Sequence, residues 1–367
     1  MNIKGEDNSK DYEDWESNDS LSNHSPNAFD PKDISVELRH ISLDDVLARI
    51  YRDEIDFFPN FQRNVGLWNN DSKSQLIESI LLNFPLPAFY FDSSNYYQWR
   101  VIDGLQRLWT LKSFIIDNSF KLSGLSVLKE LNGKTFNDLE KQHQRRILQF
   151  PIVAHLIRPG TPRFAVYDIF RRLNTGGVAL NAQEIRHALN PDETLFLNSL
   201  TKVKLFKEIT KVNSKRMEDT ELALHFVAFY LINYYDYKPP MALFLDKAME
   251  SISKLDGDKK EEILLNFAKS IEFISATLGK NAFSKKSTNS SHKRFNKALF
   301  EAWTVAIAKI DSNSRMMLLN KKVELEILYN DLLNNTEFLE SISITTSSRR
   351  AVVIRFNSIE KLLEQIK

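Results

Sequence analysis

The sequence predicts an α+β protein in which a mixed α/β half is followed by an all-helical half. Up to about residue 190, short apolar runs typical of strands, such as PIVAHLIR at 151–158, alternate with stretches of helical periodicity. From about residue 195 onward almost only helical periodicity remains, as in EDTELALHFVAFYLINYY at 218–235. We therefore expect three parts: an acidic disordered tail at 1–33, a mixed domain at 34–192 and a helical domain at 193–367.

The composition excludes several kinds of site and does not by itself indicate a function. Hydrophobic residues make up 43% of the chain, enough for a sizeable core. Lys plus Arg number 49 against 48 for Asp plus Glu, so a nucleic-acid surface would have to be a local patch. The sequence has no cysteine, which excludes disulfides and thiolate metal sites. It has neither a secretory signal nor the roughly 18 apolar residues of a membrane span, so we expect a soluble cytoplasmic protein.

The first expected elements follow from apolar spacing and from capping residues. A strand is expected over 36–41, and Ser42 is expected to cap the helix behind it. A second helix is expected within 69–84, with Asn70 or Asp71 as its cap. The apolar residues that we expect to turn toward the core on this second helix are Ile77, Ile80, Leu81 and Phe84.

The central part of the first half is expected to alternate between strands and helices. Residues 87–103 read as two strands around a turn at 92–95. A helix is expected over 105–117, a strand over 151–158 and a helix over 163–174. The helix after Asn181 has a capping box, because Glu184 stands three residues beyond that cap.

The joint between the strand and the helix in VIDGLQRLWTL, residues 101–111, is the first candidate site. Gly104 allows a left-handed turn or a close approach to a ligand, and a helix start offers free N–H groups to an anion. Arg107 could hold phosphate oxygens, Gln106 could add a polar contact, and Asp103 could hold a metal or position a water. The same residues also fit a plain connection in which Asp103 caps the helix and Arg107 makes a surface ion pair.

Two loops are further candidates for binding. Gln62 and Arg63 stand in FPNFQRNVGLW, a stretch with proline and glycine that could equally be an ordinary surface loop. Asn174 begins NTGG, a turn between two expected helices. A helix-turn-helix motif is conceivable there, but the glycines and the capping box explain the turn without DNA.

A basic segment is the candidate for nucleic-acid contact. From Gly279 to Phe300 there is no acidic residue, and a row of cations could contact a phosphate backbone or simply be solvated. The candidate cations are Lys285, Lys286, Lys293, Arg294 and Lys297. The sequence has no Walker-type loop and no Gly-x-Ser-x-Gly elbow, and its seven histidines lack ligand spacing, so we expect no metal site formed by the protein alone.

Taken in order, five motifs resemble those of the family typified by the N-terminal domain of GmrSD restriction enzymes. They are FQRNVGLW, LIESILLNFPLPAFYF, VIDGLQRLWTL, FRRLNTGGVALNAQEIRHAL and KRMEDTELALHFVAFY. The resemblance covers about residues 36 to 235. It implies a ParB/sulfiredoxin-like fold and a part in bacterial defence against phage or foreign DNA. The family hallmark, Asp-Gly-Gln-Gln-Arg, is associated with nucleotide binding and hydrolysis.

Transferred by position, the resemblance assigns roles to the same candidate residues. Asp103, Gly104, Gln106 and Arg107 match the hallmark, while Gln62 and Arg63 match an upstream Gln-Arg and Asn174 and Glu184 match a later element. Leu105 replaces the first Gln of the hallmark and Trp109 replaces a usual Thr, which threatens hydrolysis more than binding. The C-terminal His-Asn-His nuclease domain of GmrSD enzymes has an Asp-His pair, and residues 195–367 contain none.

Two main functions remain open from the sequence, and a third interpretation makes the chain itself a nuclease. The first is a nucleotide-responsive protein of DNA restriction or anti-phage defence, in which Asp103, Gln106 and Arg107 act on a nucleoside triphosphate with Mg²⁺. Gln62, Arg63, Gly104 and Asn174 would help to bind this nucleotide, and a partner nuclease would cleave DNA. The alternative is a non-enzymatic sensor module that binds DNA or a protein and keeps a degenerate pocket.

Overall fold

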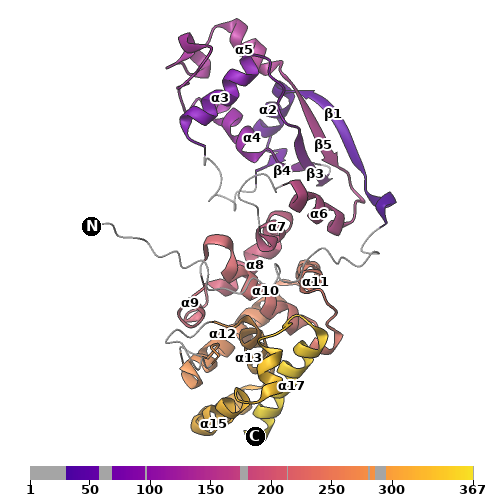
Figure 1. Ribbon diagram of the computed structural model, residues 1–367, viewed down its shortest axis with the longest axis vertical. Coiled ribbons are helices and arrows are strands. Elements are labelled where there is room, and N and C mark those ends of the chain that lie inside the picture. Colours follow the sequence, from indigo (N-terminus) through magenta and orange to yellow (C-terminus); the bar gives the residue numbers. More distant parts are fainter. Residues whose placement is uncertain are drawn as a thin grey trace, which may run out of the picture. The chain divides into compact units, whose positions relative to one another are not determined.

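The computed structural model describes residues 30–57, 68–95, 97–173, 181–212, 214–279, 282–285 and 295–366 (Figure 1). The chain divides into two compact units at residues 180 and 181. The first unit is mixed α/β and the second is all-helical, which confirms the predicted fold class. The domain boundary at 192 and 193 stays a prediction. The tail predicted for 1–33 lies outside the described residues apart from its end, where Pro31–Asp33 form a 3-10 turn.

The α/β unit alternates strands and helices in chain order. Its regular elements are β1 (Val36–Ser42), α2 (Leu43–Tyr51), β2 (Ile55–Asp56), α3 (Asn70–Leu81), β3 (Phe89–Asn95), β4 (Gln98–Asp103), α4 (Leu105–Leu111), α5 (Lys141–Leu148), β5 (Pro151–Ile157) and α6 (Arg163–Leu173). A π-turn, η5 (Lys112–Ile116), continues α4. Short 3-10 turns cover Lys129–Leu131 and Phe136–Asp138.

The five strands form one mixed sheet in the order β1-β5-β3-β4-β2. β1 pairs antiparallel with β5, and β3 pairs antiparallel with β4. β3 runs parallel to β5, and β2 runs parallel to β4. β2 places Asp56 beside Arg100 of β4, and β4 continues for three residues to Asp103, where the predicted joint begins.

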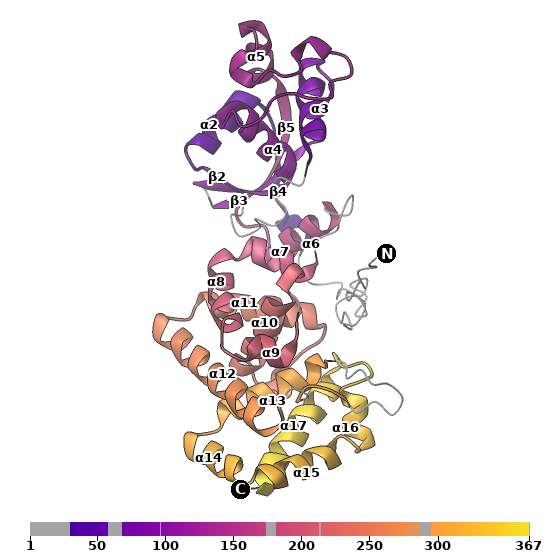
Figure 2. The ribbon, with the colours of Figure 1, turned by 90° about the vertical axis from the view of Figure 1, so that its left-hand side faces the viewer.

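Helices α2 to α5 gather on one side of the sheet (Figures 1 and 2). The core beneath them is apolar because alternate strand residues face it, while α2, α3 and α4 contribute one stripe each. Fully buried members from these elements are Leu43, Ile77, Ile80, Phe89, Phe91, Leu108, Leu111, Ala154 and Leu156. Burial of this apolar surface stabilises the unit and holds the end of β4 against α4.

Three sequence predictions in this unit need correction. The cap of α3 is Asn69, whose side chain accepts from the N–H of Ser72, so neither Asn70 nor Asp71 caps it. Phe84 is 56% exposed and lies outside the core, because α3 ends at Leu81 and the chain reverses through a left-handed residue. The turn predicted at 92–95 lies later in the chain, since β3 extends to Asn95.

A carboxylate on α3 fixes the long connection between α4 and α5. Glu78 is buried, and its two oxygens accept from the backbone N–H groups of Ser126, Val127 and Leu128 at 2.8–3.2 Å. Although burial raises the pKa of Glu78, these N–H donors outweigh it and hold the pKa below its usual value. Glu78 therefore anchors residues 126–128 of the connection, which also buries apolar side chains such as Phe120 and Leu131.

The helical unit contains eleven α-helices among its described residues. They are α7 (Ala182–Leu189), α8 (Pro191–Thr201), α9 (Phe206–Thr210), α10 (Glu218–Leu231), α11 (Met241–Ser253), α12 (Gly257–Thr277), α13 (Lys297–Lys309), α14 (Ser312–Asn320), α15 (Lys322–Leu332), α16 (Thr336–Ser341) and α17 (Arg349–Ile366). α10 and α13 lie at the centre and are buried nearly all round, with α8, α11, α12 and α17 packed against them (Figure 2). Among the described residues, no helix combines the length and the apolar character that a membrane crossing needs.

Candidate functional site at the end of strand β4

The joint after β4 turns through a glycine that the surrounding structure requires. Gly104 has a φ of 98° and stands before α4 as its N-cap, a left-handed conformation that side chains with a Cβ rarely adopt. A Cβ at this position would lie 2.4 Å from Cδ1 of Phe89 on the neighbouring strand β3. The glycine therefore serves two purposes, the sharp turn and the close approach of β3.

Arg107 binds the joint to the segment that enters β3. Its guanidinium lies 3.0 Å from the Oδ2 atom of Asp103 and donates to the carbonyls of Pro87 and Ala88. It also lies over the ring of Phe89, 4.4 Å from the ring centroid. The side chain is only 11% exposed. The structure thus gives Arg107 a role in the fold through its ion pair with Asp103. The cap that the plain-connection alternative assigns to Asp103 is not formed, because Gly104 is the N-cap and no side chain caps α4.

Asp103 is the charged group of the joint that faces solvent. Its side chain is 37% exposed, and among the described residues no hydrogen bond reaches its second carboxylate oxygen. Burial lowers the pKa of Arg107 and the charge of Asp103 opposes this, so the guanidinium stays charged at neutral pH. The pair therefore presents one oriented carboxylate oxygen beside the start of α4.

The remaining residues of the hallmark differ in their surroundings. Leu105, which replaces a glutamine of the hallmark, is half-buried and packs against the core. Gln106 is half-buried, and its carbonyl accepts from the hydroxyl of Thr110 at 2.8 Å. The ring of Trp109 lies 6.1 Å from that of Phe57, edge to face. The leucine of the joint is therefore used for packing.

Three of the predicted binding residues lie outside the described residues. They are Gln62, Arg63 and Asn174. Glu184 is described, and it begins α7 as predicted: its side chain accepts from the N–H of Asn181, and Asn181 accepts from the N–H of Glu184. Glu184 also forms an ion pair with Arg216 at 2.9 Å. Within the described structure, its contacts belong to the helical unit.

Two of the five candidate cations in the basic segment, Lys285 and Lys297, lie within the described residues. Lys286, Lys293 and Arg294 lie outside the described residues, and Lys285 is half-buried. Lys297 begins α13, is 10% exposed, and its ammonium lies 2.8 Å from the Oε1 atom of Glu221. A phosphate contact through Lys297 would first have to break this partly buried ion pair.

A buried charge network in the helical unit escaped the sequence reading. Glu301 on α13 lies 2.9 Å from Nδ1 of His225 on α10 and pairs with Arg355 on α17. Glu221 lies 3.7 Å from the other ring nitrogen of His225. Burial lowers the pKa of His225, but the two carboxylates outweigh burial and raise it above its usual value. The signal in the sequence was that His225 and Glu301 interrupt the apolar stretches of α10 and α13, because a charged group in such a stretch needs a partner when it is buried.

Acidification is expected to destabilise the helical unit through His187 on α7. Burial lowers the pKa of His187 from 6.5 to about 4. The unfolded chain therefore takes up a proton first as the pH falls through 6.5, and stability is lost progressively down to about pH 4. Between pH 7 and pH 5 the expected loss is about 2 kcal/mol. Because the raised pKa of His225 acts in the opposite direction, the loss is measured as the difference between wild type and His187→Gln in urea unfolding at both pH values. Equal pH slopes for the two proteins would contradict this assignment.

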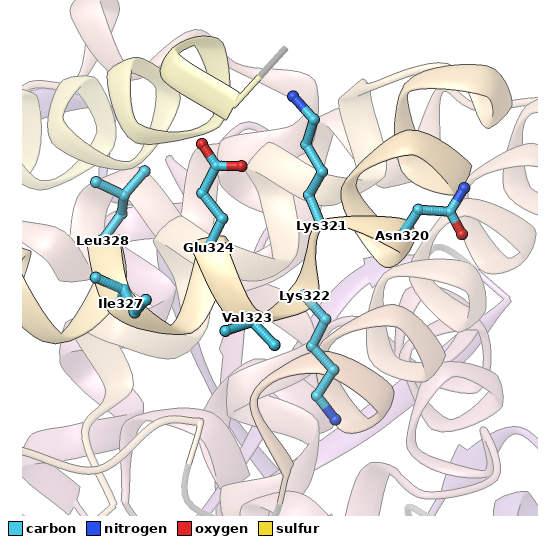
Figure 3. Close-up of a pocket in the computed structure, with 7 residues that line it drawn as sticks. All are labelled: Asn320, Lys321, Lys322, Val323, Glu324, Ile327 and Leu328. Atoms are coloured by element: carbon cyan, nitrogen blue, oxygen red, sulfur yellow. The ribbon is translucent and has the colours of Figure 1, made fainter.

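No group of three or more His, Cys, Asp or Glu side chains suited to a metal ion exists within the described ranges. A depression of about 520 Å³ lies at the junction of α14 and α15 in the helical unit (Figure 3). Lys321 and Lys322 point to opposite sides there, and Lys321 donates to the carbonyl of Ile366 at 2.6 Å. None of the predicted site residues lines this pocket, which is formed by Asn320, Lys321, Lys322, Val323, Glu324, Ile327 and Leu328.

The comparison with known families agrees with the motifs at the joint. Residues 43–190 match the family described as GmrSD restriction endonuclease, N-terminal domain. The matched range includes strands β2 to β5, the joint from Asp103 to Arg107, and the capping box that begins α7. No curated protein and no solved structure matches the chain. The similarity to the GmrSD restriction endonuclease N-terminal domain family therefore lies in residues 43–190, which hold the joint after β4.

Proposed function

We propose that this protein is a nucleotide-responsive component of DNA restriction or anti-phage defence. The family match supports a part in restriction or defence, because the matched family is described as a domain of a restriction endonuclease. The observation that supports nucleotide binding is the geometry of the joint after β4. There an exposed carboxylate, Asp103, stands beside the start of a helix that has no side-chain cap. A partner nuclease would then cleave the DNA.

The residues of the joint fit a magnesium–nucleotide complex in part. Mg²⁺ is commonly held by one or two carboxylates together with the phosphates of its nucleotide, so a single aspartate is sufficient. Asp103 would hold the ion, and the first N–H groups of α4 would meet a phosphate because Gly104 supplies no competing side chain. Bound Mg²⁺ would neutralise phosphate charge. Arg107 would orient Asp103 through their ion pair, and Gln106 would supply a polar contact.

Substitution of Asp103 by Asn is the test of this function. We expect the full-length protein to bind at least one of ATP, GTP, CTP and UTP with Mg²⁺, and Asp103→Asn to weaken this binding about tenfold or more. Calorimetric titration measures binding, and released phosphate measures turnover. Asp117→Asn is the matched control, because Asp117 also pairs with a cation, Lys112 at 2.7 Å, and is equally exposed.

The titration also separates hydrolysis from binding. Turnover that is lost in Asp103→Asn would support an enzyme. Saturable binding without turnover would support a nucleotide sensor. Absence of binding for all four nucleotides, with a normal thermal unfolding transition, would overturn the nucleotide proposal.

The second candidate function is a non-enzymatic module that binds DNA or a protein. Two observations favour it. Leu105 packs against the core where the hallmark has a glutamine, and the guanidinium of Arg107 is occupied by two carbonyls and Asp103. The contacts of such a joint can stabilise the fold without binding a ligand. DNA binding by the full-length protein that is unchanged by nucleotide and by Asp103→Asn would support this candidate.

A further inference from the structure

Strand β1 forms a long outer edge of the sheet. Among the described strands it pairs only with β5. It spans seven residues, whereas β2 at the opposite edge has two (Figure 1). Edge strands of this length are usually interrupted by proline, covered, or shortened, because their unpaired backbone groups can pair with another chain. β1 contains no proline. It is therefore a candidate surface for strand addition.

The register of β1 shows which backbone groups point outward. The N–H of Arg158 donates to the carbonyl of Ser35, and the N–H of Leu43 donates to the carbonyl of Phe150. In the same antiparallel register, Glu37, Arg39 and Ile41 turn their backbone groups toward β5. Val36, Leu38 and His40 must then turn theirs to the open edge. No hydrogen bond from the described residues reaches the N–H or C=O groups of these three.

The side chains of β1 are divided between two kinds of surface. Val36 and Leu38 are 45% and 55% exposed, which leaves two large apolar side chains in solvent beside the open edge. Glu37 and Arg39 project to the other face, where their charged groups lie 2.6 Å apart. Glu37 also lies 3.3 Å from Arg158. An acid and a base thus stand symmetrically on either side of Leu38.

We propose that β1 pairs antiparallel with β1 of a second copy of this chain, about a two-fold axis at Leu38. In this register Val36 faces the partner's His40, Leu38 faces the partner's Leu38, and Glu37 faces the partner's Arg39. The three outward residues of each copy face one another, so all their free N–H and C=O groups pair. The two sheets become one, and the symmetric contact closes on itself as a dimer.

Charge complementarity is the reason for choosing a second copy over an unrelated strand. Opposite charges that face each other across an antiparallel pair stabilise it, and like charges destabilise it. In a strand with the order apolar, acid, apolar, base, the acid of one copy faces the base of the other when the two copies run antiparallel about the central apolar residue. β1 has this order in Val36, Glu37, Leu38 and Arg39.

Charge reversal tests the register with the full-length protein. In sedimentation velocity, we expect the wild type to dimerise in the micromolar range, as small interfaces do. Glu37→Arg and Arg39→Glu each place like charges opposite one another, and each is expected to weaken the dimer about tenfold or more. When the two variants are mixed, the introduced arginine of one copy would face the introduced glutamate of the other. Opposite charges then meet again, so a mixed dimer is expected to form.

The outcomes are separable. A mixed dimer formed by two variants that are monomeric alone would establish the pairing. A wild type that stays monomeric up to about 100 µM, above the micromolar range expected of a small interface, would overturn it. Variants that dimerise as tightly as the wild type would also overturn it, because another surface would then be responsible. Both variants should unfold at the wild-type temperature, since exposed ion pairs contribute little to stability.

A backbone substitution provides an independent check. Leu38 faces His155 in a pair that exchanges no hydrogen bonds with β5, so its N–H is used only at the open edge. Leu38→Pro removes that donor and leaves the pairing with β5 intact. We expect loss of the dimer with an unchanged far-ultraviolet circular dichroism spectrum. A folded Leu38→Pro protein that still dimerises would overturn the proposal.

Discussion

Replacing Glu301 by Ala is expected to destabilise the helical unit by about 3–5 kcal/mol. Glu301 is fully buried between His225 and Arg355, and Arg355 is also fully buried. Without the carboxylate, a guanidinium remains in an apolar environment with its main counter-charge removed. The carbonyl of Thr346, which accepts from Arg355 at 2.5 Å, is neutral and cannot replace that charge. Hydrogen exchange of the α10, α13 and α17 amides measures the loss in the unit concerned.

The control for Glu301 is an ion pair of the same kind at the surface. Glu337 lies 3.3 Å from Arg350, and both side chains are well exposed. Glu337→Ala is expected to change stability by no more than about 1 kcal/mol. The double variant Glu301→Leu with Arg355→Met removes both charges of the buried pair and should recover much of the loss. A loss below about 1 kcal/mol for Glu301→Ala would mean that the buried pair does not form.

Replacing Gly104 by Ala is expected to destabilise the α/β unit by about 2–6 kcal/mol. A left-handed residue other than glycine costs about 1–3 kcal/mol, and overpacking costs a similar amount. Both apply here, because φ is 98° and the added Cβ would lie 2.4 Å from the ring of Phe89. Phe89 is fully buried in the core, so its ring has little room to move. Hydrogen exchange of the β3 and β4 amides reports the effect directly.

Two other glycines separate the causes of this effect. Gly133 also has a positive φ, 83°, but an added Cβ would meet nothing within 4 Å. Gly133→Ala should therefore show only the conformational cost, about 1–3 kcal/mol. Gly257 begins α12 in open space without a positive φ, and its substitution by Ala should be nearly neutral. If Gly104→Ala destabilises the protein no more than Gly133→Ala does, then the contact between the added Cβ and the ring of Phe89 does not contribute to the loss.

The local sequence was sufficient for most elements of the fold. Ser42 was identified as a helix cap because a short polar side chain precedes an apolar helical stripe, and Asn181 because Glu184 stands three residues later in a capping box. The first residue of α3 was less predictable. Its true cap, Asn69, stands beside two further residues, Asn70 and Asp71, that could cap equally well. Neighbouring residues of equal propensity leave the choice to packing.

The candidate site was located by its sequence pattern, but its internal contacts were not. The order Asp, Gly, Gln, Arg at a strand-to-helix joint predicted where a site would stand. It left open whether Arg107 faces a ligand or the fold. The answer depended on the carbonyls of Pro87 and Ala88, which no periodicity connects with Arg107. They come near only because β3 lies beside β4 in the sheet.

Patterns along the chain were enough to predict most of the order of elements, the change from mixed to helical structure, and the family that residues 43–190 match. These properties depend on periodicity, capping and motif order, all of which are local. The sheet order, the open edge of β1 and the partners of Glu301 became known only from the folded structure. Each of these depends on which distant segments meet, and that is selected by burial of the whole apolar surface rather than by neighbouring residues.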